Sequence, residues 1–345
     1  MDSLYCGIDY HKNTCTICLL DDNGKFSETS TVKTTNVIKY LSNKDLKEIA
    51  IEASGGVNEF VDRLKSCGHK VKIVNPSAFR LIGFNGKKTD KKDAQALAEG
   101  LKGDYLPTVH HKSKSSREIK SLLIGRETIV RSRVNLSNSI RGMLREQGIT
   151  IPAGKDKFIK EIRGKINLIK HEQIKKLIIN QVELFFILLQ QETVAEELLD
   201  ELTQNIGEIE LLKNIPGVGS LTALAIIAVA DDISRFDSGK NFASYLGLVP
   251  RESSSGGKRR LGSITRSGSE ILRRYLIHGA RSVIMHSCRY NNKVSDPNKL
   301  WALRLKDKVG MNKATVALAH RMSRIIFAIL RDGSVYEEKT FARSA

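Results

Sequence analysis

Residues 4–33, LYCGIDYHKNTCTICLLDDNGKFSETSTVK, contain three runs of apolar and β-branched residues separated by turn residues. The runs at 4–9, 15–21 and 25–33 have the length and composition of β-strands. The last two are joined by Asp-Asn-Gly, a sequence typical of a tight hairpin turn. The stretch therefore predicts three successive strands, and it places Asp9 at the end of the first.

Alternating helix and strand patterns continue through the first 110 residues. The predicted elements are a helix at 37–41, a strand at 48–54, a helix at 57–68 and a strand at 70–76. A first strand that ends in Asp, followed by hairpin strands and alternating elements, is similar to the ribonuclease H-like fold. A similarity in fold does not by itself define a function.

The rest of the chain is predicted to be mainly helical. Residues 115–212 repeat apolar residues at three- and four-residue intervals, which predicts a long helical hairpin or coiled coil with a break near Pro152–Gly154. A Gly turn in KNIPGVGS, at 213–220, resembles a helix-hairpin-helix element that holds a phosphate, and a plain turn between packed helices fits equally well. We therefore predict three domains, at 1–110, 111–212 and 213–345.

The composition is that of a globular protein without a membrane span. The chain has 345 residues, of which 41% are hydrophobic, and no apolar run approaches the roughly 20 residues that a span needs. The N-terminus lacks the pattern of a signal peptide, so we expect a cytoplasmic protein. Cys15 and Cys18 have CxxC spacing, but a strand points the two thiols to opposite faces, which favours buried thiols over a metal site.

Positive charge is concentrated in the C-terminal third. The whole chain has a formal net charge of +18 at pH 7. Residues 245–345 contain 20 Lys and Arg residues against 7 Asp and Glu residues, whereas residues 1–110 contain 16 and 14. This distribution favours nucleic acid as a partner over a merely solvated basic surface.

Four acidic residues form the most informative pattern in the N-terminal region. Asp9 and Glu52 lie at predicted strand ends, and a predicted helix presents Asp90 and Asp93 on one face through their i, i+3 spacing. Carboxylates suit Mg²⁺, and a pair of such ions stabilises both oxygens of a phosphodiester transfer. Singly, each acid has a structural explanation, such as Asp90 as a helix N-cap. Together they predict a metal site.

A serine-rich basic loop lies in the C-terminal region. Ser253, Ser254 and Ser255 precede two glycines and the basic run Lys258–Arg260. A serine hydroxyl can attack phosphorus and conserve the bond energy in a phosphoserine, while nearby cations neutralise charge. From composition alone, a flexible loop that contacts phosphate is favoured over nucleophilic chemistry.

Basic residues in this loop, in the following helix and beside the acidic residues are candidates for nucleic-acid contacts. The candidates are Lys258, Arg259, Arg260, Arg266, Arg273, Arg274, Lys87 and Lys88. Their structural alternative is a solvated basic face. If they bind nucleic acid, neutralising several of them weakens binding and lowers its salt dependence.

Six motifs together resemble one family. They are GIDYHKN at 7–13, IEASGG at 51–56, VNPSAFR at 74–80, KTDKKDAQALAE at 88–99, IPGVGSLTA at 215–223 and FASYLGLVPRESSSGGKRRLGSITRSGSEILRR at 242–274. In this order they resemble the DEDD transposases of bacterial insertion sequences, which include the Piv DNA invertase and the bridge-RNA-guided recombinases. The resemblance extends from residue 5 to about 285.

The resemblance implies a role for each part of the chain. It implies a RuvC-like N-terminal domain with Mg²⁺, in two ions and replaceable by Mn²⁺, bound by Asp9, Glu52, Asp90 and Asp93. It also implies a C-terminal transposase domain in which Ser255 attacks DNA and forms a covalent intermediate before strand exchange and religation. Ser253 departs from the tyrosine usual in the family, and the neighbouring Ser254 leaves a second candidate nucleophile.

The same resemblance implies several partners. These are double-stranded donor and target DNA, a structured guide RNA, and further copies of the chain in a dimer or tetramer, without a membrane. It further implies a bacterial cytoplasmic protein that associates with the nucleoid when it binds DNA.

Three other functions compete with a recombinase that uses both serine and metal. A metal-dependent nuclease or junction resolvase would use the serine loop only to bind phosphate. A nucleic-acid-binding protein without catalysis has no reason to hold four converging carboxylates near DNA. A sugar-kinase-like ATPase also begins with a Gly-Ile-Asp strand, but no second Gly-rich phosphate motif follows.

Overall fold

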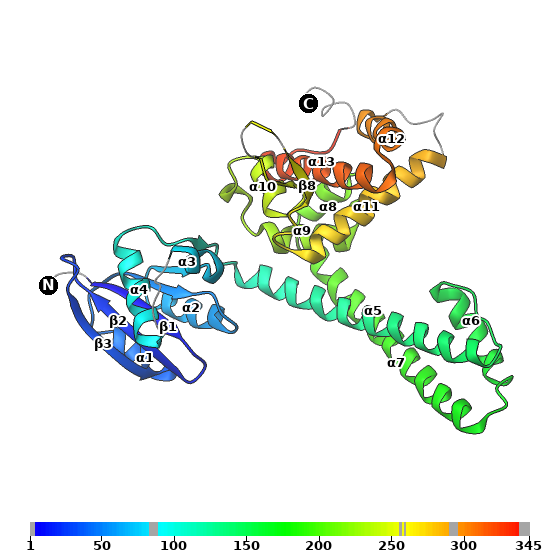
Figure 1. The fold of residues 1–345 in the computed structure, drawn as a ribbon, viewed down its shortest axis with the longest axis horizontal. Coiled ribbons are helices and arrows are strands. Elements are labelled where there is room, and N and C mark those ends of the chain that lie inside the picture. The colour runs from blue at the N-terminus through cyan, green and yellow to red at the C-terminus, as the bar shows by residue number, and fades with distance from the viewer. Residues whose placement is uncertain (1–3, 83–88, 255–256, 259, 290–295, 338–345) are drawn as a thin grey trace. The chain divides into compact units, whose positions relative to one another are not determined.

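The computed structural model divides the chain into two compact units, Met1–Lys112 and Ser113–Ala345 (Figure 1). It describes residues 4–82, 89–254, 257–258, 260–289 and 296–337. Unit 1 is mixed α/β and unit 2 is mainly helical, in agreement with the predicted fold class. The finer division into three domains stays a prediction.

Unit 1 is built on a six-stranded sheet in the order β3-β2-β1-β4-β5-β6. β2 is antiparallel to β1 and β3, β4 is parallel to β1 and β5, and β6 is antiparallel to β5. The strands are β1 (Leu4–Tyr10), β2 (Thr14–Leu20), β3 (Phe26–Lys33), β4 (Leu46–Glu52), β5 (Val71–Val74) and β6 (Thr108–Val109). All five predicted strands are present, and the two-residue β6 is an addition.

Helices cover both faces of this sheet. They are η1 (Thr34–Asn36), α1 (Val37–Leu41), α2 (Val57–Ser66), α3 (Pro76–Ile82) and α4 (Asp90–Lys102). On one face Ile8 and Ile51 pack with residues of α1 and α2, and Cys15 belongs to the same core. On the other face Cys18 packs against Ala94 of α4. The two thiols of the CxxC sequence are buried on opposite faces, as predicted.

Gly7 lets α4 approach the sheet closely. A Cβ atom at this position would lie 2.0 Å from the Ala94 carbonyl oxygen and 2.6 Å from the Ala98 backbone nitrogen. Any other residue would therefore have to move the helix. Because β1 carries Asp9 and α4 begins with Asp90, this close packing sets the separation of two acidic residues.

Unit 2 begins with a helical hairpin. It consists of α5 (Lys114–Glu146) and α7 (Glu172–Thr203), with α6 (Lys155–Ile166) between them (Figure 1). The break near Pro152–Gly154 is confirmed, since these residues lie between α5 and α6. Ile140, Phe158 and Phe185, one from each helix, share a core at the tip of the hairpin.

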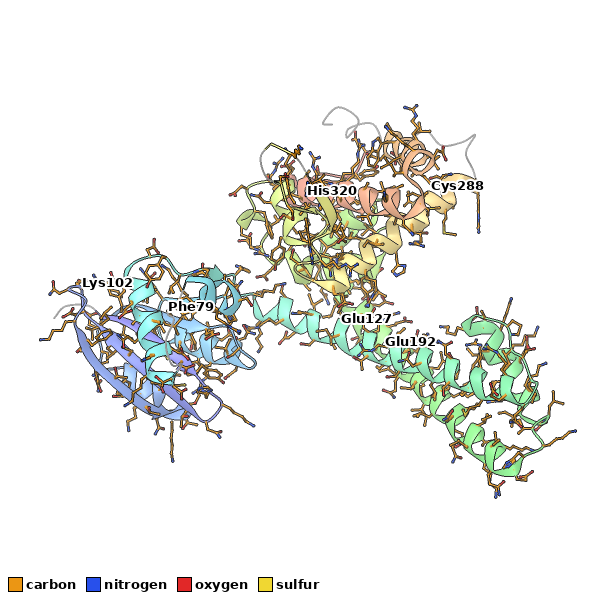
Figure 2. The ribbon with its side chains drawn as sticks, in the orientation of Figure 1. Phe79, Lys102, Glu127, Glu192, Cys288 and His320 are labelled. Carbon is orange, nitrogen blue, oxygen red and sulfur yellow. The ribbon has the colours of Figure 1, made fainter. Side chains whose placement is uncertain are left out.

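The base of the hairpin belongs to a second core of unit 2. Ile119 and Leu123 of α5 and Leu199 of α7 pack there with the C-terminal helices. Arg133 of α5 lies between the residues that this helix contributes to the two cores. It is buried and forms an ion pair with buried Glu192 of α7, which is labelled in Figure 2. A paired charge of this kind favours one alignment of two helices, because a shift that broke the pair would leave the Arg133 charge buried and uncompensated.

The remaining elements complete unit 2. They are α8 (Glu208–Lys213), α9 (Ser220–Ala230), η2 (Ile233–Arg235), α10 (Gly239–Tyr245), β7 (Pro250–Glu252), β8 (Leu261–Ile264), α11 (Glu270–Arg289), α12 (Pro297–Val309) and α13 (Met311–Asp332). β7 and β8 form an antiparallel hairpin where the sequence predicted only a basic loop. Among the described helices of the chain, none is long and apolar enough to span a bilayer.

The predicted Gly turn connects α8 to α9. Gly217 has a φ of +86°, a conformation that favours glycine. Its carbonyl oxygen would lie 2.0 Å from a Cβ atom placed on Gly279 of α11. Tight packing against α11 thus accounts for both glycines, which favours the structural interpretation of this turn over the phosphate-binding one.

Candidate active site

The ends of β1 and β4 bring two of the predicted acidic residues together. The strands are parallel neighbours, and Ile8 pairs with Ile51 in their register. Asp9 and Glu52 follow these residues, so both lie on the face that α4 covers. The Asp9 side chain is only 13% exposed. A carboxylate so enclosed is costly unless a partner compensates its charge.

The first turn of α4 supplies the other two acids. Thr89 Oγ1 accepts a hydrogen bond from the Lys92 backbone N–H over 3.4 Å and caps the helix. Asp90 is therefore not the N-cap but the first helical residue. Asp90 and Asp93 both lie in this first turn, where the helix dipole favours negative charge.

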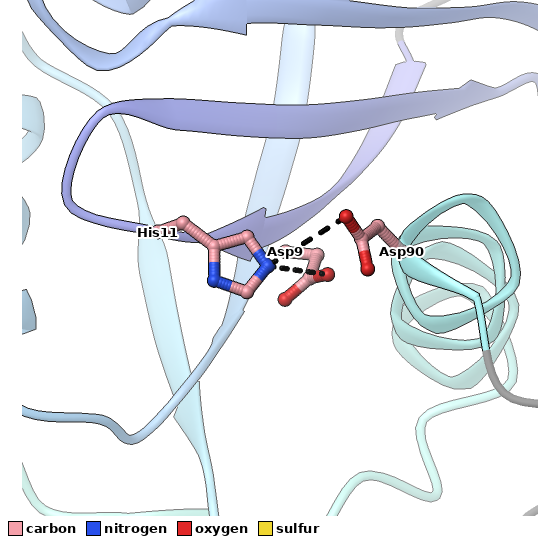
Figure 3. A group of neighbouring side chains, drawn as sticks. All are labelled: Asp9, His11 and Asp90. Atoms are coloured by element: carbon pink, nitrogen blue, oxygen red, sulfur yellow. Dashed lines mark ion pairs between the residues drawn. The ribbon is translucent and has the colours of Figure 1, made fainter.

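His11 joins the cluster (Figure 3). Its Nε2 atom lies 3.4 Å from Asp9 Oδ2 and 3.8 Å from Asp90 Oδ2. One possible ligand atom from each of these three residues lies within 4.8 Å of the others. Sequence reasoning missed His11, although its position two residues after Asp9 at a strand end was a usable signal, since such residues share a face.

Electrostatics link all four predicted acids. The pKa of the Asp9 carboxyl is raised, mainly because burial disfavours its charged form, while His11 opposes the shift. The negative charges of Asp90, Asp93 and Glu52 raise this pKa further. The three other acids thus all disfavour the charge on Asp9, and a bound cation would relieve this repulsion.

The predicted serine loop connects β7 to β8 in unit 2. The Ser253 backbone N–H donates to the Arg260 carbonyl oxygen over 3.0 Å and so continues the hairpin. The Ser254 hydroxyl donates to Glu252 Oε1 over 2.6 Å and accepts from the Arg260 backbone N–H over 3.2 Å. Ser254 is therefore engaged in holding the loop.

Two of the predicted nucleic-acid contacts are engaged within unit 2. Arg273 is 8% exposed, and its Nη1 atom donates to the carbonyl oxygens of Leu246 and Ser267 over 3.2 and 2.7 Å. Its burial does not fit an exposed helix face, and it lowers the pKa of the guanidinium. Arg274 pairs with Glu127 of α5 (Figure 2). Both side chains have structural roles.

The other predicted site residues fall into two groups. Lys258, Arg260 and Arg266 are exposed on or beside the hairpin, as a nucleic-acid contact requires. Four lie outside the described residues, namely Ser255, Arg259, Lys87 and Lys88. For these four the predicted roles stay predictions.

Known proteins similar to this chain match it along nearly its whole length. Residues 6–148 match the DEDD transposase family of the IS110 type, and residues 209–295 match the Transposase IS116/IS110/IS902 family. The chain is 32% identical to the transposase for insertion sequence element IS1111A of Coxiella burnetii, over 96% of this chain and 90% of that protein. It is 31% identical to a probable family 20 transposase of Pseudomonas aeruginosa, over 84% and 85%. It is 28% identical to a pilin gene-inverting protein of Moraxella lacunata, over 98% and 99%.

Together, the clustered carboxylates, the basic helical unit and these matches define an enzyme of the DNA transposase and recombinase class. The chain belongs to the IS116/IS110/IS902 family of insertion-sequence transposases. This confirms the family resemblance predicted from the six sequence motifs.

Proposed function

We propose that this transposase cuts and rejoins DNA with Ser255 as the nucleophile and a divalent-metal site formed by Asp9, Glu52, Asp90 and Asp93. One observation supports the proposal: possible ligand atoms of Asp9, His11 and Asp90 lie within 4.8 Å of one another, and Asp9 is largely enclosed. The negative charges of Asp93 and Glu52 also raise the pKa of Asp9. Like charges placed so close together repel each other, and a cation is the simplest compensation.

The sheet supports a RuvC-like fold for this site. Three strands joined by hairpins are followed by β4 and β5, which run parallel to β1. Asp9 and Glu52 end the two central strands of this arrangement. That is the order of elements expected for the ribonuclease H-like fold from the sequence.

The donor set fits a divalent cation. Asp9 and Asp90 offer carboxylate oxygens and His11 an imidazole nitrogen within a small space, a combination that suits Mg²⁺ or Mn²⁺. Glu52 and Asp93 would complete the ligands of a two-ion site. Bound ions would supply charge neutralisation at the phosphodiester. The tight packing of α4 on β1 holds the donors in place beforehand.

Ser255 would carry the covalent step. Its hydroxyl oxygen attacks a DNA phosphorus, the bond from phosphorus to one deoxyribose oxygen breaks, and the released DNA hydroxyl takes up the proton. Attack by another DNA hydroxyl reverses these steps and frees the serine. Exposed Lys258 and Arg260 lie close in sequence and can neutralise the phosphate. Because the Ser254 hydroxyl is already engaged by Glu252, we favour Ser255 as nucleophile.

The variant S255A tests the proposal. We expect it to form no covalent adduct with labelled DNA on a denaturing gel, and no recombinant product, while its affinity for Mn²⁺ stays unchanged. The matched variant S254A should still form the adduct. Normal cleavage by S255A would instead establish the alternative, a metal-dependent nuclease or junction resolvase whose serine loop only binds phosphate.

We further propose that the enzyme acts as a dimer or tetramer. The helix α7 carries five apolar side chains that are 41–55% exposed: Leu177, Leu184, Ile187, Val194 and Leu198. Their steps of seven, three, seven and four residues are those of a coiled-coil seam, which a second copy of α7 would cover. Light scattering that detected only a monomer would contradict this.

Donor and target DNA are the expected substrates. We propose that a structured guide RNA selects both DNA sites by base pairing. The excess of basic residues at 245–345 supports binding of nucleic acid in general. Sequencing of RNA that copurifies with the protein tests the guide. Recovery of only degraded bulk RNA would oppose this part of the proposal.

A further inference from the structure

Unit 2 contains a groove whose lining includes none of the acidic-site residues. It has a volume of about 1430 Å³ and is lined by β8, the start of α10, and residues of α11, α12 and α13. Pockets for small molecules usually measure roughly 300–1,000 Å³. The groove therefore has room for a longer ligand.

The α13 wall of this groove carries a basic stripe. Six lining positions recur at steps of three and four residues, so they share one face of the helix: Lys313, Ala317, His320, Arg324, Ala328 and Arg331. His320 is labelled in Figure 2. At about 1.5 Å per residue the stripe is about 27 Å long. The two alanines leave space between the cationic side chains.

Basic residues outnumber acidic ones in the lining of the groove. The basic residues there are Arg266, Arg273, Lys313, Arg321, Arg324 and Arg331, and the acidic one is Asp237. Arg331 forms an ion pair with Asp332, and Arg273 donates to backbone carbonyl oxygens, so these two cations are already engaged. Neither Lys313 nor Arg324 forms an ion pair with any residue that the structure describes. Both side chains are exposed. A polyanion is the ligand that this charge distribution favours.

Apolar and aromatic side chains line the same groove. Leu248, Ile264 and Ile277 contribute aliphatic surface, and Trp301 contributes an indole ring. The Arg321 guanidinium lies over that ring, 4.9 Å from its centroid. Cations beside aromatic and apolar surface suit a strand whose bases are accessible as well as its phosphates. A duplex keeps its bases stacked inside, so only an unpaired strand matches both features.

We propose that this groove binds a single unpaired DNA strand during strand exchange. The inference rests on the proposed function, in which a serine attack releases one DNA strand beside the β7–β8 loop. β8 and Pro250 of β7 both line the groove, so the released strand would enter it directly. The α13 stripe would hold the phosphates, and the surface around Trp301 would hold the bases.

Trp301 provides a direct measurement, because it is the only tryptophan of the chain. We expect a single-stranded DNA oligonucleotide of about 12 nucleotides, within the usual range of such sites, to quench its fluorescence in the full-length protein. Binding of the same oligonucleotide, detected by anisotropy of a terminal dye, without any change at Trp301 would place the strand elsewhere and overturn the proposal.

A charge variant tests the α13 stripe. We expect K313Q/R324Q to bind the single strand about 10-fold more weakly and to lower the salt slope by about 1.4, since each lost phosphate contact removes about 0.7. The control K160Q/K176Q removes two exposed lysines from α6 and α7 and should stay within about two-fold of wild type. Equal losses in both variants would overturn the proposal.

The identity of the strand is tested with RNA and duplex DNA of the same sequence. Weaker binding of K313Q/R324Q to RNA alone would assign the groove to RNA, and weaker binding to the duplex alone would assign it to paired DNA. Either result would overturn the proposal for an unpaired DNA strand. A failure of the proposed serine mechanism can be told apart from a failure of this inference. If S255A still formed covalent adducts, the serine assignment would be wrong, but the Trp301 fluorescence and the salt slope would still report on the groove.

Discussion

The acidic site of unit 1 and the serine hairpin of unit 2 hold their candidate functional residues in different ways. Asp9 and Glu52 end central strands of a six-stranded sheet, and Asp90 begins a helix packed tightly on that sheet. The serine loop instead connects strands of three and four residues, and every residue of β7 is exposed. The core therefore restrains the acids, whereas the described residues of the serine loop, 253–254, 257–258 and 260, are all exposed. In this comparison, the fold preorganises the acidic site more than the described part of the serine loop.

The largest effect is expected from D9N. Loss of a charged ligand should remove several kcal/mol of charge stabilisation and lower recombination on the order of 10³-fold. Thermal stability should not fall, because the neutral side chain of the variant removes the repulsion between Asp9 and the three other acidic residues. Recombination assays, calorimetric titration with Mn²⁺ and thermal melting check this. Unchanged Mn²⁺ affinity would show that the enclosed carboxylate is not a ligand.

A smaller effect is expected from G7A, which tests whether packing holds the acidic site. The added methyl group meets the Ala94 carbonyl oxygen and should destabilise unit 1 by about 1–3 kcal/mol. Displacement of α4 should also weaken Mn²⁺ binding. The control G125A in α5 adds a methyl group with no atom within 4 Å and should stabilise its helix by about 0.5–1 kcal/mol. Urea unfolding measures the change in stability of each variant. Equal stability of G7A and wild type would contradict the preorganisation of the acidic site.

The smallest effect is expected from S254A, a variant in the β7–β8 hairpin. The variant loses hydrogen bonds to Glu252 and Arg260, which should cost at most about 0.5–1.5 kcal/mol. Because the hairpin is exposed, we expect a small change in melting temperature and a yield of covalent adduct within a few-fold of wild type. Complete loss of the adduct would transfer the nucleophile assignment to Ser254.

Most of unit 1 was predictable because buried strands appear as apolar runs bounded by turn residues. Asp9 and Glu52 could be placed at strand ends on this basis alone. The β7–β8 hairpin was not predicted, because Pro250–Glu252 has no apolar alternation. Its pairing instead depends on contacts across the loop, such as the hydrogen bond between Ser253 and Arg260.

Contacts between residues distant in sequence were not predictable. The position of His11 two residues after Asp9 was a usable signal, but its approach to Asp90 depends on α4 folding over the end of β1. The sequence predicted that Arg273 is an exposed cation on a helix. In the structure its guanidinium is buried and donates to the carbonyl oxygens of Leu246 and Ser267. Neither contact is encoded in the spacing of nearby residues.

Helices α5 and α7 both contribute residues to the two cores of unit 2, so the hairpin arm that they form has a defined length and a defined rotational alignment. Between Leu123 at the base and Ile140 at the tip, 17 steps of about 1.5 Å give a length of roughly 25 Å. One inserted residue would rotate the tip by about 100° against the base and separate Arg133 from Glu192. The length of this arm can therefore change without loss of angular phase only in increments near seven residues, or two turns.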